Sequence, residues 1–487
     1  MLNKKYQKKL PLLSVINNEL GGVIKWCTPS IHPMVPRVNS IYENDISISY
    51  HSLGNPSLNT GIFKEAHELA AKAYKAERTL FSVNGSTGSN FIVFRALKHQ
   101  LGKVRMLAQR NVHKSVSVAT EDYRINVTYL KPHYDQKLQI FVPNTLKEIV
   151  EGLKENPETN VVFFSNPTYE GLSLDLTKVI SAVRKINSKI IIFVDEAWGA
   201  HFPFSDKLPV CAMEAGADIC VQSIHKQGSG LQQTSMIHWQ GSRIDEKFVM
   251  DSYKSLITTS PSFHLLASLD GSRYLMETMG EEIIGELIDV ADYLKESLAK
   301  ISAITVIYPS EIKKKYPQVG AVDSTKVLIN VKKTGLAGYE IAKHLEAGYG
   351  VVVEKYEADN ILFISTFKNS RFDVEETARY LKETIKDLSK GKRKTHKGFP
   401  DFPVKIIKKL PSYEVNGAKL FKVDLNKSVG LVCAEDVVPY PPGIPLIVKG
   451  EVIQKEHIEY LNALRNCKGL ISVVMNDQNV GTILIVR

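Results

Sequence analysis

The sequence has few cysteines and no long hydrophobic runs. Its five cysteines are scattered and form no Cys-x-x-Cys pair, so we expect reduced thiols and no structural metal. No segment approaches the roughly 18 uninterrupted apolar residues that span a membrane. Four lysines lie within Met1–Leu10, but Pro11 and polar residues follow them in place of the apolar core of a secretory signal. These absences predict a cytoplasmic protein.

Positive charge is in excess but is not concentrated. The formal net charge is +10, yet the basic residues form a dense run only at 390–397 (KGKRKTHK). That run has no interleaved aromatic residues, which favours a solvated linker over a nucleic-acid site. We therefore expect neither nucleic acid nor membrane as a partner, and an anionic cofactor fits the charge equally well.

Strand and helix patterns alternate between residues 62 and 290. Short apolar segments predict strands at Thr79–Val83, Lys103–Ala108, Val127–Leu130, Val161–Ser165, Ile190–Val194, Ile219–Gln222 and Ser235–Trp239. A helix is predicted before the first strand, at Ile62–Tyr74, and helices are predicted between most of the strands, including Phe91–Leu101, Leu146–Glu155 and Leu176–Ile186. This alternation predicts an α/β fold with a mostly parallel sheet, whose ligands lie at the carboxyl ends of the strands.

The 487 residues are long enough for two or three domains. We place an N-terminal arm at 1–61, a large domain at 62–290 and a small α/β domain at 291–390, reached through a long helix from Glu281 to Ile301. Residues 391–487 form a linker and a C-terminal domain that contains the proline-rich segment Val438–Pro445.

Two of the predicted strands lead into a lysine and an aspartate. Ser223-Ile224-His225-Lys226 follows one strand, and Asp195 follows another. At the ends of two strands of one sheet, a lysine amine forms a Schiff base with an aldehyde cofactor, and a carboxylate keeps a pyridine nitrogen protonated. Pyridoxal 5'-phosphate is held in this way. When each residue is considered alone, a simpler explanation is favoured: Lys226 is a loop lysine and Asp195 caps the end of a strand.

Two further strand ends suit the same cofactor. Asn84–Gly88 follows a strand and opens a helix, so its free N–H groups and two hydroxyls suit a phosphate. An ordinary tight turn with a helix cap explains this segment as well. His113 ends the next strand, where an imidazole can stack on a pyridine ring and move a proton; alone, it is more simply a surface histidine before a helix.

Together, these motifs resemble those of the bacterial Orn/Lys/Arg decarboxylases, which have the aspartate-aminotransferase-like fold (fold type I) of pyridoxal-phosphate enzymes. The ordered set covers about residues 62–470 and is more specific than any single motif. The matching segments are NGST (84–87), RNVHKS (110–115), DEAWGAHF (195–202), SIHK (223–226), TTSPS (258–262), ASLD (267–270), PYPPGIP (439–445) and GE (450–451).

The resemblance implies roles for individual residues. Lys226 would bind the cofactor aldehyde, Asp195 would pair with the pyridine nitrogen, His113 would stack on the ring, and Ala197 would touch its opposite face. Lys226, Asp195 and His113 would be the catalytic residues. The residues implied to hold the phosphate are Ser86, Thr87, Ser223 and His225. The chain length implies the short form of the family, without the N-terminal response-regulator-like domain of longer members.

Two N-terminal segments depart from the family pattern. The family usually has Pro-Gly-His-Lys and then an Asp-Leu pair, whereas this chain has Thr28-Pro29-Ser30-Ile31-His32-Pro33 and Tyr50-His51-Ser52-Leu53. Because this region lies near the substrate entrance in the family, the departures affect substrate choice and, to a lesser degree, the reaction itself.

The resemblance implies decarboxylation of a basic L-amino acid to an amine, as in polyamine biosynthesis, with loss of the α-carboxylate and reprotonation of Cα by Lys226 or a neighbouring histidine. Arginine is favoured over lysine or ornithine because short-form members include arginine decarboxylases. Another pyridoxal-phosphate reaction of aminotransferase, oxidase or lyase type stays open, because substrate pose decides which bond breaks. A non-catalytic binding protein is the third alternative.

The sequence leaves the distal end of the substrate without an assigned partner. Glu170, Glu451 and Asp45 are acidic candidates, each more simply a surface or structural carboxylate. The resemblance also implies at least a homodimer with shared active sites, in which Thr259 or Ser260 contributes a hydroxyl to the neighbouring subunit's phosphate site. A plain loop is the alternative for these two residues.

Overall fold

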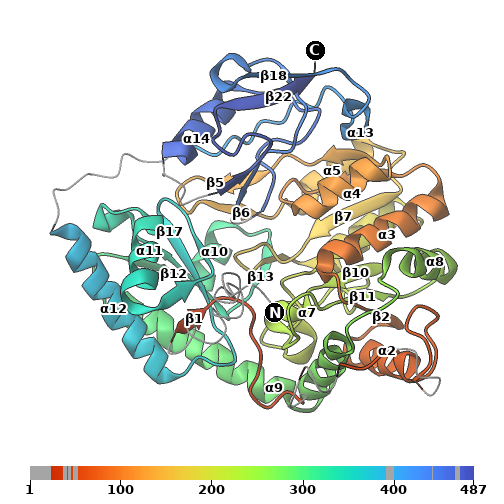
Figure 1. Cartoon of the computed structure of the whole chain (residues 1–487), viewed down its shortest axis with the longest axis horizontal. Coiled ribbons are helices and arrows are strands. Elements are labelled where there is room, and N and C mark those ends of the chain that lie inside the picture. The colour runs from red at the N-terminus through yellow and green to blue at the C-terminus, as the bar shows by residue number, and fades with distance from the viewer. Residues whose placement is uncertain are drawn as a thin grey trace, which may run out of the picture.

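The computed structural model describes residues 23–36, 41, 45–47, 53–390, 400–440, 443–466 and 472–486. The chain folds into a large α/β unit, a small α/β unit and a C-terminal unit, which lie at the right, left and top of Figure 1. Most of the basic run at 390–397 and all of residues 1–22 lie outside the described residues.

The large unit is built on a mixed seven-stranded sheet in the order β2-β11-β10-β9-β7-β3-β4. The strands are β2 (Arg78–Ser82), β3 (Arg105–Ala108), β4 (Asn126–Tyr129), β7 (Val161–Ser165), β9 (Ile191–Asp195), β10 (Ile219–Gln222) and β11 (Ser235–Trp239). β11 is antiparallel to both of its neighbours, and the pairs from β10 to β4 are parallel. The predicted α/β fold with a mostly parallel sheet is therefore confirmed.

Alternation along these strands gives the sheet two apolar faces. In β9, Ile191 and Phe193 belong to one core cluster, and Ile192 and Val194 belong to the other. Successive side chains of a strand point to opposite faces, so a continuous apolar run is what a doubly covered strand needs. The covering helices are α3 (Gly85–Leu101), α4 (Lys114–Asp122) and α8 (Glu246–Leu256) on one face, and α5 (Leu146–Glu155) and α6 (Leu176–Ile186) on the other.

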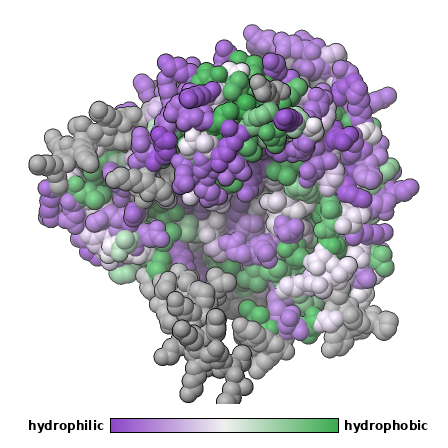
Figure 2. Space-filling view, turned by 45° about the horizontal axis from the view of Figure 1, so that its top comes forward, coloured by the Kyte–Doolittle hydropathy of each residue, from purple (hydrophilic) through white to green (hydrophobic). Residues whose placement is uncertain are grey.

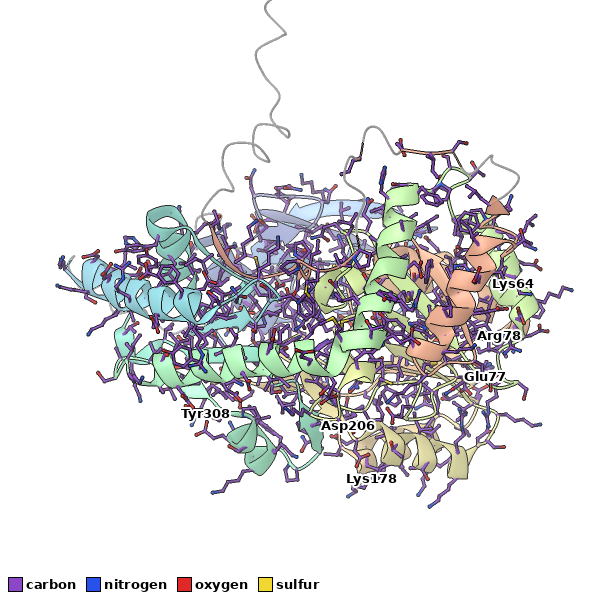
Figure 3. The ribbon with its side chains drawn as sticks, turned by 90° about the horizontal axis from the view of Figure 1, so that it is seen from below. Lys64, Glu77, Arg78, Lys178, Asp206 and Tyr308 are labelled. Atoms are coloured by element: carbon purple, nitrogen blue, oxygen red, sulfur yellow. The ribbon has the colours of Figure 1, made fainter. Side chains whose placement is uncertain are left out.

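Two helices differ from the prediction. α3 begins at Gly85 and not at Phe91, so the glycine- and serine-rich segment forms its first turn. The helix predicted from Glu281 is continuous with the one that begins at Phe263, and together they form the 37 residues of α9 (Phe263–Ala299). The predicted domain boundary at residue 290 lies inside this helix. Figure 3 shows α9 extending from the large unit beneath the small one.

The small unit has an antiparallel sheet in the order β12-β14-β17-β16. Its elements are β12 (Thr305–Ile307), β14 (Lys326–Asn330), α11 (Gly338–Tyr349), β16 (Lys355–Tyr356), β17 (Asn360–Ile364) and α12 (Arg371–Ser389). The described part of the N-terminal arm joins this unit, because β1 (Ile24–Trp26) pairs in parallel with β15 (Val351–Val353). Trp26 is fully buried there, and its indole N–H donates to Thr377 at 2.8 Å.

The C-terminal unit packs helix α14 (Lys455–Asn466) against the sheet of β18 (Leu420–Asp424), β22 (Thr482–Val486) and β19 (Val432–Cys433). Figure 2 shows a largely hydrophilic face with scattered hydrophobic areas. On the underside, Lys64 and Lys178 extend outward from α2 (Ile62–Ala73) and α6 (Figure 3). Within the described residues, no helix combines the length and apolarity needed to span a membrane.

Candidate active site

The eight residues selected from the sequence line one cavity of about 340 Å³. They lie at or just beyond the carboxyl ends of β2, β3, β9 and β10, where an open α/β sheet places its ligands. The eight are Ser86, Thr87, His113, Asp195, Ala197, Ser223, His225 and Lys226. The sheet thus brings together side chains from four separate sequence motifs. Their roles stay predictions.

Lys226 lies in the short helix α7 (Ile224–Gln227), near the centre of Figure 1. Its amine is 3.9 Å from the centroid of the Trp198 ring, and a second lysine, Lys326, is 4.3 Å from the same centroid. Burial lowers the pKa of Lys226 to about 8, an effect that Asp195 opposes and Lys326 reinforces. A pKa near 8 leaves about a tenth of the amine neutral, and therefore nucleophilic, at pH 7, far more than an ordinary lysine provides.

Asp195 ends β9 and is buried. Its Oδ1 accepts the backbone N–H of Ala197 at 3.1 Å, and its Oδ2 accepts the amide of Asn90 at 3.1 Å. Burial raises the pKa of Asp195, while the bond from Asn90 and the charge of Lys226 oppose that rise. A buried carboxylate held by neutral donors is placed to pair with a cation inside the cavity.

A chain of hydrogen bonds joins Asp195 to His113. The second amide hydrogen of Asn90 is donated to Ser115 Oγ at 3.1 Å, and Ser115 Oγ lies 2.8 Å from His113 Nδ1. The Ser115 backbone N–H also donates to His113 Nδ1, which caps α4. Burial, assisted by Lys226 and Lys114, lowers the pKa of His113 to about 4. His113 is therefore a neutral imidazole at neutral pH, with Nδ1 as an acceptor.

The opposite end of the cavity lies at the start of α3. Gly85 has φ of +64°, and a Cβ added there would meet nothing within 4 Å, so the approach to the helix terminus is open. The Ser223 hydroxyl donates to Ser86 Oγ at 2.8 Å. His225 Nδ1 lies 2.8 Å from the Thr234 carbonyl and donates to it. Free N–H groups, hydroxyls and a helix dipole together suit an anionic group.

Several residues of the site were missed by the sequence reasoning. Asn90 and Ser115 do not line the cavity but belong to the hydrogen-bond network that orients Asp195 and His113, and Ser115 lies within a quoted motif. Trp198 also lies within a quoted motif, and its aromatic face beside a lysine was the available signal. Thr28 belongs to the N-terminal segment that departs from the family pattern, whereas no sequence signal pointed to Glu354. Both residues reach the cavity through the pairing of β1 with β15.

The three acidic residues considered for the distal end of the substrate do not line this cavity. Glu170 is buried in an ion pair with Lys355 at 2.8 Å, and Glu451 is buried in an ion pair with Arg110 at 3.2 Å. Asp45 is exposed. Glu170 and Glu451 are therefore structural carboxylates, which was the simpler of the two explanations offered for them. Within the described residues, the acidic side chains that do line the cavity are those of Asp195 and Glu354.

Thr259 and Ser260 are exposed and lie outside the cavity of their own chain. The C-terminal unit does reach it, because Tyr440 and Ile444 line the wall next to His113. Within the described residues, no group of three or more His, Cys, Asp or Glu side chains is arranged to hold a metal ion.

Comparisons with known proteins agree with this geometry. Residues 38–373 match the family model described as "Orn/Lys/Arg decarboxylase, major domain". Residues 399–471 match "Orn/Lys/Arg decarboxylase, C-terminal domain". The chain is 32% identical to "Arginine decarboxylase" of Bacillus subtilis over 82% of this chain and 81% of that protein. It is 31% identical to "Arginine decarboxylase" of Halalkalibacterium halodurans, over 88% and 86% of the two chains.

Among solved structures, the fold is similar to that of the lysine decarboxylase of Francisella novicida. The TM-score is 0.76 at 21% identity, and the match covers 92% of this chain and 75% of that one. The family expected from the motifs is confirmed. This chain belongs to the Orn/Lys/Arg decarboxylase family.

Proposed function

We propose that this protein is a pyridoxal 5'-phosphate-dependent decarboxylase that converts a basic L-amino acid, arginine foremost, to an amine and CO₂. The proposal rests on one observation. Lys226, Asp195, His113 and the start of α3 all line one cavity, in a chain that belongs to this family. Arginine is favoured because the two relatives compared above carry the name "Arginine decarboxylase". Lysine and ornithine follow.

The residues present fit the cofactor. The open space at Gly85 and the free start of α3 suit its phosphate, for which we propose Ser86, Thr87, Ser223 and His225 as ligands. Because His225 Nδ1 already donates to Thr234, it is Nε2 that must carry a proton toward the phosphate. Burial lowers the pKa of His225 to about 4, so a dianion beside it would have to raise that pKa.

The other cavity residues are proposed to bind the ring and the aldehyde of the cofactor. When bound, the cofactor withdraws electrons from the substrate Cα so that the bond to the carboxylate can break. Lys226 supplies the amine for covalent attachment. Asp195, fixed by Asn90, holds a proton on the pyridine nitrogen. His113, fixed by Ser115, would offer a flat imidazole face to the ring, and Ala197 would contact the other face.

A second candidate is another pyridoxal-phosphate reaction, of aminotransferase, oxidase or lyase type, on a related amino acid. One specific observation favours it: Thr28, from the N-terminal segment that departs from the family pattern, lines the cavity. A change of side chain at this position alters the surface that orients the substrate. The pose of the substrate decides which of its bonds aligns with the ring and breaks.

We also propose a homodimer or larger homo-oligomer with shared sites. Thr259 and Ser260 are exposed in the single chain. A second cavity, of about 630 Å³, lies between the N-terminal arm and α9, and its lining includes Val35, Pro36 and Leu231. Both features suit contact with a second copy. We propose a cytoplasmic location and a role in polyamine biosynthesis; the free thiols of the four described cysteines support a reducing compartment.

The test is to incubate purified, cofactor-loaded protein with arginine, lysine and ornithine separately and to measure both CO₂ and product amine. We expect equimolar CO₂ and amine, with arginine the fastest substrate. The Lys226→Ala variant is the matched control and should release neither. Amine without equimolar CO₂ would exclude decarboxylation and favour the second candidate, and no turnover of any of the three would contradict the proposed substrate class.

A further inference from the structure

A second groove, of about 790 Å³, lies along one edge of the large sheet. One wall is β4 with the residues that follow it, up to Pro132, and the other wall is formed by the segment 404–411. β4 is the last strand in the order of the sheet, and among the described residues it pairs with β3 alone. We call this space the edge groove. Its described lining shares no residue with the candidate active site.

The backbone of β4 presents hydrogen-bonding groups to the edge groove. The Asn126 N–H and the Leu130 N–H donate in the opposite direction, to the segment of β3, at 3.1 and 2.8 Å. Backbone groups of successive residues in a strand point to opposite sides, so those of Val127 and Tyr129 point away from β3. The Val127 carbonyl confirms this direction, because it accepts a bond from the Lys408 amine across the groove at 3.4 Å. Such edge groups are a template for another strand.

Lys408 is a partly buried cation in the edge groove. Burial, reinforced by the charge of Arg110, lowers the pKa of Lys408. The two carboxylates that oppose this effect are engaged elsewhere. Glu451 pairs with Arg110 at 3.2 Å, and Asp436 already accepts two hydrogen bonds. A carboxylate brought into the groove would therefore stabilise the Lys408 ammonium.

The rest of the lining combines positive charge with apolar surface. No acidic side chain is among the described residues that line the groove. The basic lining residues are Lys131, Lys405, Lys408 and Lys409, and Val404 and Leu410 are among the apolar ones. Side chains of a strand alternate between its two faces. A strand that alternates acidic and apolar residues therefore matches both properties of the lining.

We propose that the edge groove binds an extended acidic segment of a partner protein, which joins the large sheet as a strand beside β4 and places a carboxylate against Lys408. In this mode of recognition, main-chain hydrogen bonds provide affinity and side chains provide specificity. Lysines at a sheet edge discourage pairing with other strands in general, so a strand that carries carboxylates is selected. The inference is independent of the proposed reaction, in which no residue of the groove has a role.

The first test is binding of a fluorescent peptide to the full chain, loaded with cofactor and followed by anisotropy. The probe is an acetylated, amidated hexapeptide of alternating glutamate and valine. We expect saturable binding with a Kd below about 1 mM, weakened by added salt. The matched control replaces each glutamate by glutamine and should bind at least about tenfold more weakly. Absence of binding, or equal binding of the two peptides, would overturn the proposal.

Two further probes separate a bound strand from a bound anion. A version of the acidic peptide with N-methylated valines keeps its charges but loses three N–H donors, and it should bind at least about tenfold more weakly. Equal affinity would show that charge alone is recognised and would overturn strand addition. Inorganic tripolyphosphate at the peptide's own Kd should leave most of the peptide bound. Complete displacement would identify a site for free anions and would also overturn the proposal.

The site is located by charge-removing variants. Lys408→Gln should weaken binding of the acidic peptide about tenfold, and Lys408→Arg should retain most of it. Lys64→Gln removes the same charge from an exposed position on α2 (Figure 3) and should have no effect. Equal losses in Lys408→Gln and Lys64→Gln would place the peptide outside the groove. The double variant Lys405→Gln with Lys409→Gln changes exposed residues only, so it tests the groove even where Lys408→Gln unfolds. It should weaken binding about threefold, and unchanged binding would overturn the proposal.

A direct readout is the reactivity of Lys408 itself. Acetic anhydride labels its amine across a pH series, and the labelled peptide is quantified by mass spectrometry. Bound acidic peptide should raise the midpoint of Lys408 labelling, because an anion stabilises the ammonium, and should leave that of Lys64 unchanged. An unchanged Lys408 midpoint at saturating peptide would refute the contact. Sedimentation of wild type and Lys408→Glu should give the same assembly. Loss of assembly in the variant would show that a second copy of this chain occupies the groove, which would overturn the assignment to an acidic partner.

Discussion

Replacing Asp195 with asparagine removes a charge from the cavity with little change of shape. The asparagine oxygen can still accept the Ala197 N–H, while its amide would face the amide of Asn90. Losing one such buried hydrogen bond costs about 1–3 kcal/mol of folding free energy. A half-turn of the Asn90 side chain reduces this cost, because Asn90 Oδ1 has no partner within the described residues. We therefore expect Asp195→Asn to fold.

The effect on turnover is larger. A charge-assisted bond to the pyridine nitrogen contributes about 1.5–3 kcal/mol in binding, and more where charge develops in the transition state. Since 1.36 kcal/mol corresponds to a factor of ten in rate, kcat should fall at least about a hundredfold. The assay is CO₂ release at saturating substrate, with bound cofactor quantified by its absorbance.

Asn90→Ala is the matched control for Asp195→Asn. It removes a hydrogen-bond donor to Asp195 but leaves the carboxylate, so its kcat should fall by less than about tenfold. If the Asp195→Asn enzyme binds the cofactor and retains near-normal turnover, Asp195 only caps the end of its strand and takes no part in catalysis. Equal losses in the two variants would assign the effect to side-chain position and not to charge.

Three further predictions concern attachment, assembly and acid stability. Borohydride should fix the cofactor to Lys226 and fail in Lys226→Ala; labelling of another lysine would contradict the assignment. Mixing Lys226→Ala subunits with subunits altered to alanine at Thr259 and Ser260 should restore activity absent from both parents, whereas an active monomer in sedimentation would exclude shared sites. His67 accepts the Phe81 N–H at 3.0 Å, and burial lowers its pKa to about 3. The unfolded chain therefore binds that proton first, and the free energy of unfolding should fall as pH drops from about 6.5 toward 3. His67→Gln should weaken this fall by about 1.36 kcal/mol per pH unit in urea titrations, and an unchanged slope would refute it.

The sheet was predictable because its strands are buried on both faces. Val161–Ser165, Ile219–Gln222 and Ser235–Trp239 were predicted with the bounds that the structure has. Each is mostly apolar along both faces, with polar residues at strand ends and His238 inside β11, and apolar residues on both faces are the pattern of a doubly covered strand. Convergence of the eight site residues followed from that sheet, because residues placed after parallel strands meet at one edge.

The start of α3 was predicted six residues late, and the helix predicted from Glu281 is continuous with the one that begins at Phe263. In α9, a Cβ at Gly271 would lie 2.8 Å from the Pro36 carbonyl, and one at Gly280 would lie 2.7 Å from the Cβ of Phe204. These glycines allow close contact with the helix and do not end it. Propensity costs of about 1 kcal/mol per glycine are outweighed by such packing.

The parts of the site that were not predictable depend on contacts between distant segments. Glu354 and Thr28 are 326 positions apart and meet only because β1 pairs with β15. A periodicity within β1 or β15 indicates a strand but says nothing about its partner. The role of Asn90 was not predictable from the sequence either, because it depends on the position of its side chain between Asp195 and Ser115.

The proline-rich segment of the C-terminal unit shows why a motif can be recognised before its role is understood. Arg110, which follows β3, donates to the Pro445 carbonyl at 2.8 Å and pairs with Glu451 at 3.2 Å. The Lys114 N–H donates to the Gly443 carbonyl beside His113. Removing one partner of a buried ion pair costs about 3–5 kcal/mol. The wall of the cavity next to His113 is therefore fixed by a charge pair between two units, which makes the C-terminal unit a part of the candidate active site.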